Sequence, residues 1–185
     1  MTISIISASV RSGRKSNRVA LYFQNYITEN AVANVKILDL CDYKFPIFDE
    51  RLKFLSNPSK QVIQFAEEIK NADAVIVVTP EYNGGYPASL KNVIDLLNAE
   101  WKRKPIAIAT VSEGDFGGSQ VITSLLFTLW KIGAWVAAAT FPVPNIEKKF
   151  NENGIPADKE LIDKRAKKFL DELVWCAEAK KKMTS

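Results

Sequence analysis

The 185-residue chain contains no histidine. This absence excludes Ser-His-Asp and Cys-His nucleophilic catalysis, zinc sites of the H-E-x-x-H type and any histidine general base. The two cysteines, Cys41 and Cys176, match no metal-ligand or redox spacing and fall in apolar-patterned segments, so we expect both to be reduced and packed. We therefore predict no metal site and assign no catalytic side chain, which leaves a bound cofactor as the source of chemistry.

Extremes of charge and long apolar runs are also missing. The net charge is +4, from 25 basic and 21 acidic residues whose signs are interleaved, so we expect no nucleic-acid partner. No run approaches the roughly 18 apolar residues of a membrane span, and no leader-like segment precedes Thr2, so we expect a cytoplasmic protein without a membrane partner. Length and composition predict one compact domain over residues 1–185.

Five short apolar runs alternate with five segments of helical period, which predicts an α/β fold built from βαβ units. The runs are rich in Ile and Val and nearly continuous in apolar character, as in parallel strands that are buried on both faces. The expected strands are Thr2–Ser7, Asn34–Leu40, Ala74–Thr79, Ile106–Ser112 and Ala134–Ala139. The expected helices lie near residues 19–27, 62–69, 88–97 and 125–129 and over Asp158–Lys180.

The common strand order for five such units is 2-1-3-4-5, and ligands bind outside the carboxyl ends of the strands where that order reverses. The loops after the first, third and fourth strands would then line one crevice. Turns favour glycine anyway, but the longest connection, Asp42–Pro58, has none. Six of the eight glycines fall in the three crevice loops: Gly13, Gly84, Gly85, Gly114, Gly117 and Gly118.

The first crevice loop leads directly into a predicted helix. A helix N-terminus offers unpaired N–H groups and a partial positive charge, which suit a phosphate dianion. Ser16 could instead only cap the helix, but capping needs one such residue and this loop has several polar donors. The candidate phosphate ligands are Ser9, Arg11, Ser12, Arg14, Ser16 and Asn17.

The other two crevice loops are suited to a planar heterocycle. Glycine lets a flat ring approach the backbone, and an amide side chain can bind its edge. Phe116 could pack on such a ring or cap the core. The candidate residues are Pro80, Glu81, Tyr82, Asn83 and Gly84 in one loop, and Ser112, Gly114 and Gly117 in the other.

The Asp42–Pro58 connection carries several apolar side chains in turn-like surroundings. Such side chains can cover a core edge, form a lid or make a subunit contact, and the sequence leaves these alternatives open. The apolar residues of the connection are Phe45, Phe48, Leu52 and Phe54.

At these motifs the sequence resembles the NADPH-dependent FMN reductase family of the flavodoxin-like superfamily, which includes quinone, chromate and azo-dye reductases. The most specific match is Pro80-Glu81-Tyr82-Asn83 with the later run from Leu90 to Asp95. The resemblance extends to the Ser9-x-Arg11 opening and to Gly117-Gly118. It implies a flavodoxin-like three-layer sandwich with sheet order 2-1-3-4-5.

The resemblance also implies function. FMN would be held with its phosphate by Ser9, Arg11, Ser16 and Asn17, its ring against Pro80 to Gly84, and its other side by Ser112 to Gly117. NADPH or NADH would supply hydride for a small acceptor: a quinone, free flavin, azo or nitro compound, or chromate. A flavodoxin-type electron carrier is the alternative, although this chain lacks the T-x-T-G-x-T phosphate loop of such carriers.

This chain departs from the family pattern in two places, and the roles of several residues stay open. The family often has glycine where this chain has Ala8, and the stretch from Arg11 to Ser16 is longer than in many members. The roles of Arg14, Lys15 and Arg18 are therefore open between the FMN phosphate, the extra phosphate of NADPH and solvent. The family tends to form homodimers or homotetramers, for which this chain offers apolar area that could equally be core: Phe45, Phe48, Trp101 and Trp130.

Overall fold

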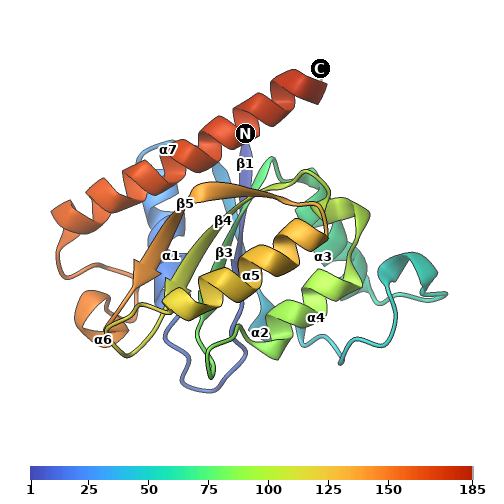
Figure 1. Ribbon diagram of the computed structural model, residues 1–185, viewed down its shortest axis with the longest axis horizontal. Coiled ribbons are helices and arrows are strands. Elements are labelled where there is room, and N and C mark those ends of the chain that lie inside the picture. The colour runs from blue at the N-terminus through green and yellow to red at the C-terminus, as the bar shows by residue number, and fades with distance from the viewer. Residues whose placement is uncertain (185) are drawn as a thin grey trace.

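The computed structural model describes residues 1–184, and Ser185, the last residue of the predicted domain, lies outside that range. Five parallel strands form one sheet with the order β2-β1-β3-β4-β5, which confirms the predicted topology (Figure 1). The strands are β1 (Thr2–Ser7), β2 (Asn34–Asp39), β3 (Ala74–Pro80), β4 (Pro105–Val111) and β5 (Trp135–Val143).

Helices cover both faces of the sheet, with α1 and α7 on one face and α3, α4 and α5 on the other (Figure 1). The longer helices are α1 (Asn17–Glu29), α3 (Lys60–Asn71), α4 (Ala88–Leu96), α5 (Ser119–Lys131) and α7 (Lys159–Thr184). Short helical turns are α2 (Leu40–Tyr43), η1 (Leu52–Phe54), η2 (Ala99–Trp101) and α6 (Ile146–Lys149).

The central strand β3 shows why the sheet is buried on both sides. Its side chains alternate between the two cores, with Ile76 and Val78 facing α1 and α7, and Val75 and Val77 facing α3, α4 and α5. All four are at most 1% exposed. A strand whose successive side chains are apolar and buried on both faces is typical of the middle layer of a three-layer sandwich.

Strand β5 continues past its predicted end at Ala139 to Val143. The extension contains Pro142, and proline has no N–H to donate to a ladder. In the structure β5 pairs only with β4, so it is an edge strand, and proline is tolerated there.

The long connection after β2 is anchored rather than loose. Tyr43 stacks on Phe45, and both rings meet Phe65 of α3 edge-on. The Asn92 side chain on α4 donates to the Pro46 carbonyl at 2.8 Å and accepts from the Phe48 N–H. Of the alternatives left open by the sequence, covering a core edge is therefore the one that these contacts support for Phe45 and Phe48.

Candidate functional site

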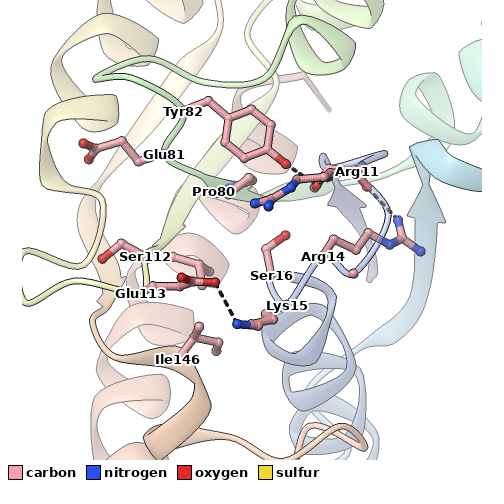
Figure 2. Close-up of a pocket in the computed structure, with 13 residues that line it drawn as sticks. Arg11, Arg14, Lys15, Ser16, Pro80, Glu81, Tyr82, Ser112, Glu113 and Ile146 are labelled. Atoms are coloured by element: carbon pink, nitrogen blue, oxygen red, sulfur yellow. Dashed lines mark hydrogen bonds and ion pairs between the residues drawn. The ribbon is translucent and has the colours of Figure 1, made fainter.

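A cleft of about 220 Å³ opens at the carboxyl ends of β1, β3 and β4, where the strand order reverses (Figure 2). The sequence predicts the crevice at this edge. Its walls come from the first loop, the start of the second, the start of the third, and α6. The lining residues are Ser9, Arg11, Gly13, Arg14, Lys15, Ser16, Pro80, Glu81, Tyr82, Val111, Ser112, Glu113 and Ile146.

Two buried serines belong to the lining on the first-loop side. Ser9 is 0% and Ser16 is 2% exposed. Ser16 occupies the N-cap position of α1, yet its side chain makes no capping bond, and its hydroxyl has no hydrogen-bond partner among the described residues. A buried hydroxyl without a partner costs about 1–3 kcal/mol, so an oxygen-rich ligand at the positive end of α1 would satisfy it. The donor set fits the phosphate of FMN.

The cations of the first loop differ in what they contact. Arg14 forms a two-pronged ion pair with Asp39 at the end of β2 and donates to the Ser9 carbonyl at 2.7 Å. Arg18 donates to the Phe150 carbonyl at 3.0 Å. Arg11 is exposed, and its side chain makes no hydrogen bond or ion pair within residues 1–184, although its charge helps to lower the pKa of Glu113. It is therefore the one arginine of this loop that is available to an anion.

Lys15 reaches across the cleft to Glu113 (Figure 2) and also forms an ion pair with Glu147. Its Nζ lies 2.7 Å from an oxygen of Glu113 in the third loop and 2.8 Å from one of Glu147 on α6. Hydrogen bonds to these two carboxylates raise the pKa of the Lys15 ammonium, and the contact with Lys15 lowers the pKa of Glu113. Lys15 therefore connects the first loop to the third loop and to α6 through ion pairs.

The second loop folds back on itself as a tight turn. Tyr82 and Gly85 exchange backbone hydrogen bonds of 2.8 and 3.0 Å, and Asn83 and Gly84 between them have φ of 52° and 78°. Positive φ at both central residues defines a type I′ turn, which the Asn-Gly pair favours. The turn directs Tyr82 toward the first loop, where its hydroxyl lies 2.7 Å from Ser9 Oγ.

The third loop satisfies most of its own polar groups. Ser112 donates to the Gly114 carbonyl at 2.8 Å, and Asp115 accepts from Asn145 at 2.8 Å. Gly117 is buried, and a Cβ there would lie 3.0 Å from Pro142 Cβ. The glycine at position 117 is therefore explained by packing within the protein.

Seven of the twelve predicted site residues line the cleft and five do not. Asn17 is the first residue of α1, Asn83 lies at the exposed tip of the turn, and Gly114 is an exposed loop residue. Those in the lining are Ser9, Arg11, Ser16, Pro80, Glu81, Tyr82 and Ser112. Those outside it are Asn17, Asn83, Gly84, Gly114 and Gly117.

Six lining residues lie outside the twelve predicted ones: Gly13, Arg14 and Lys15 of the predicted phosphate loop, and Val111, Glu113 and Ile146. Val111 and Glu113 flank the predicted Ser112, so proximity along the chain was the available signal. Ile146 comes from α6, a four-residue helix with no periodicity to detect. Within residues 1–184 no cluster of acidic and cysteine side chains is arranged to hold a metal, and no helix has the length and apolar character to cross a membrane.

Comparison with known proteins identifies relatives of the whole cleft-bearing region. The model of the family described as NADPH-dependent FMN reductase matches residues 1–148. An NAD(P)H-dependent FMN reductase of Saccharomyces cerevisiae is 34% identical over 133 residues, which cover 65% of this chain and 69% of the yeast protein. An NAD(P)H-dependent FMN reductase of Schizosaccharomyces pombe is 30% identical over 167 residues, which cover 86% of this chain and 82% of the S. pombe protein.

Solved structures agree on the fold. The flavoenzyme NAD(P)H:(acceptor) oxidoreductase FerB from Paracoccus denitrificans superposes with a TM-score of 0.75 at 21% identity, covering 93% of this chain and 96% of that one. This likeness confirms the flavodoxin-like architecture predicted from the sequence. The chain belongs to the NADPH-dependent FMN reductase family, whose members are oxidoreductases that use FMN and a nicotinamide cofactor.

Proposed function

We propose that this chain binds FMN in the cleft with the phosphate at the N-terminus of α1. The observation that carries the proposal is the Ser16 hydroxyl, which is buried in the lining without a partner. Arg11 would supply the neutralising charge, since its side chain is free of partners among the described residues. Charge-assisted hydrogen bonds of this kind are about twice as strong as neutral ones.

Other residues of the cleft would hold and shape the cofactor site. The Arg14–Asp39 pair fixes the first loop against β2, and Lys15 fixes it against the third loop and α6. Pro80, Glu81 and Tyr82 would lie along the ribityl chain and ring. Bound FMN supplies hydride transfer between a nicotinamide and a small acceptor, so the protein needs to bind and orient rather than to provide a reactive side chain.

A small oxidised molecule, such as a quinone, free flavin, an azo or nitro compound, or chromate, would be the acceptor. The extra phosphate of NADPH needs a cation, yet Arg14, Lys15 and Arg18 all have partners in the protein. We therefore expect NADH and NADPH to serve with similar efficiency at this site.

We also propose that the protein works as a homodimer or homotetramer. Phe127 and Trp130 on α5 support this, because each is 66% exposed and the two rings lie 5.8 Å apart. Trp101 does not contribute such area, since it is 1% exposed and its indole N–H donates to the Ile94 carbonyl.

The test is to purify the protein, load it with FMN, and follow NADH and NADPH oxidation with a quinone as acceptor. We expect bound flavin absorbance, turnover with either nicotinamide, and double-displacement kinetics. Bound FMN without nicotinamide oxidation would favour an electron carrier instead. Absence of FMN affinity would overturn the proposal.

A further inference from the structure

A second hollow of about 580 Å³ lies on the α2 and α4 side of the first loop and shares no lining residue with the cleft. Its walls are formed by Val10, by the connection after β2 and by the first turn of α4. Most of the lining is apolar, and Val10 and Ile47 are 49% and 90% exposed. The lining residues are Val10, Leu40, Cys41, Lys44, Phe45, Pro46, Ile47, Ala88, Ser89 and Asn92.

The polar side chains in these walls mostly have partners already. The Ser89 hydroxyl donates to the Ala8 carbonyl at 2.6 Å. Asn92 uses both ends of its amide to hold the Pro46 carbonyl and the Phe48 N–H. These bonds fix the shape of the hollow, so a ligand would meet preformed apolar walls rather than mobile polar groups.

Lys44 is the only ionisable side chain of the lining that is charged at neutral pH, and no acidic residue belongs to the lining. Its ammonium has no ion-pair partner within residues 1–184. Its backbone adopts a left-handed conformation, with φ of 48° and ψ of 45°, at the C-cap of α2. A lysine rarely adopts this conformation, and such strain persists where the surrounding structure fixes the residue.

The positive end of α4 adds to this charge. Ala88 and Ser89 are the first two residues of this nine-residue helix and line the hollow, and the helix has no side-chain cap. The hollow thus combines apolar walls with positive charge at its rim. Such a combination is complementary to a planar apolar molecule that carries one acidic group.

We propose that this hollow binds a planar aromatic anion, a fused-ring sulfonate or carboxylate, with its rings against Phe45, Ile47 and Val10 and its acidic group at Lys44. The site is separate from the cleft and does not depend on bound FMN. Because the hollow adjoins the first loop from the opposite side, it offers a place where an aromatic compound is held beside the cofactor site.

The probe is naphthalene-2-sulfonate, compared with the uncharged naphthalene-2-sulfonamide, and binding is measured by titration calorimetry without nicotinamide. The wild-type protein is expected to bind both at one site, the sulfonate more tightly. Lys44→Met is expected to weaken sulfonate binding about fivefold and to leave sulfonamide binding unchanged, since it removes one exposed charge pair. Ala88→Phe, which fills the hollow, is expected to abolish binding of both.

Lys164→Met is the matched control, because Lys164 is an exposed lysine on α7, on the far face of the sheet. Equal effects of the two lysine substitutions, or no binding of either probe, would overturn the proposal. If adding the sulfonate releases the flavin, seen as a loss of bound flavin absorbance, the sulfonate binds in the cleft and the proposal is wrong. If Ala88→Phe changes the molecular mass of the protein in solution, the occupant of the hollow is a second copy of the chain, which also overturns the proposal. The flavin signal and the heat of binding are read separately, so failure here is distinct from failure of the proposed function.

Discussion

The first loop follows β1 and the third follows β4 at the same edge of the sheet, and both are rich in polar residues, although the first has one glycine and the third has three. They differ in how their polar groups are satisfied. The third loop bonds Ser112 to Gly114, Asp115 to Asn145 and Thr110 to the Gly117 carbonyl. The first loop leaves the Ser16 hydroxyl and the Arg11 guanidinium without partners among the described residues.

We propose that the first loop binds the cofactor phosphate and that the third loop mainly stabilises the fold. An unsatisfied buried hydroxyl is costly in the protein alone, so the Ser16 hydroxyl beside the N-terminus of α1 is the stronger sign of a ligand. Glycine content by itself does not discriminate between the two roles. Substitutions in the third loop should therefore change folding, and those in the first loop should change cofactor affinity.

The largest effect is expected from Gly117→Ala, which should lower the free energy of unfolding by about 2–4 kcal/mol. The new Cβ would lie 3.0 Å from Pro142 Cβ, and φ of 62° disfavours any L side chain. Chemical denaturation of the flavin-free protein measures the change.

Two other glycines give a graded control for that substitution. Gly13 has φ of 68° but no atom within 4 Å of an added Cβ, so Gly13→Ala should show the backbone cost alone. Gly114 has neither a positive φ nor a close neighbour, so Gly114→Ala should be nearly neutral. Equal losses at the three positions would contradict the packing explanation.

Arg11→Met should weaken FMN binding by about 2 kcal/mol, or roughly thirtyfold, because it removes the only unpaired arginine of the first loop. The unfolding transition of the flavin-free protein should not move. Flavin fluorescence during titration measures the dissociation constant. An unchanged FMN affinity would remove Arg11 from the proposed site.

Ser16→Ala should weaken FMN binding about fivefold, which corresponds to one neutral hydrogen bond of about 1 kcal/mol. The flavin-free protein should be no less stable than wild type, since the hydroxyl has no partner to lose. Ser112→Ala is the comparison, because that hydroxyl already donates to Gly114. A larger FMN effect at Ser112 than at Ser16 would reverse the assignment of the two loops.

The smallest effect is expected from Glu113→Gln, which breaks one arm of the Lys15 bridge. The pKa of Glu113 is lowered in the folded protein, so its stabilising effect is present above the ordinary carboxyl pKa and is lost as the pH falls through the lowered value. Thermal melting should show a slightly lower midpoint at neutral pH and low salt. The difference from wild type should vanish in acid and at high ionic strength, because Glu113 is exposed and Lys15 is partly exposed to solvent.

Much of the fold was predictable because its signals are local and repeated. The five apolar runs predict the strands, and the last helix, expected over Asp158–Lys180, is observed as α7 over Lys159–Thr184. The end of β5 was not predictable, because tolerance of Pro142 depends on an edge position that only the assembled sheet defines.

The sequence predicts where the candidate site lies, but it predicts only part of the side-chain interactions within it. The sequence indicates which loops meet at the strand ends, so Ser9, Ser16 and Tyr82 were named together. It does not show that Arg14 is held by Asp39, or that Lys15 reaches Glu113 across 98 positions of chain. Those pairings depend on tertiary geometry, and they decide which cation of the first loop is available.

The segment after the family match has a consequence for how this protein can be divided. The match ends at residue 148, yet α7 supplies much of the apolar cover on one face of the sheet. Just before α7, Gly154 approaches α1 so closely that an added Cβ would lie 2.7 Å from the Arg18 carbonyl oxygen and the Tyr22 nitrogen. A fragment cut at residue 148 would lack α7 and expose the apolar side chains of the sheet face that this helix covers, so we expect the matched portion not to fold by itself.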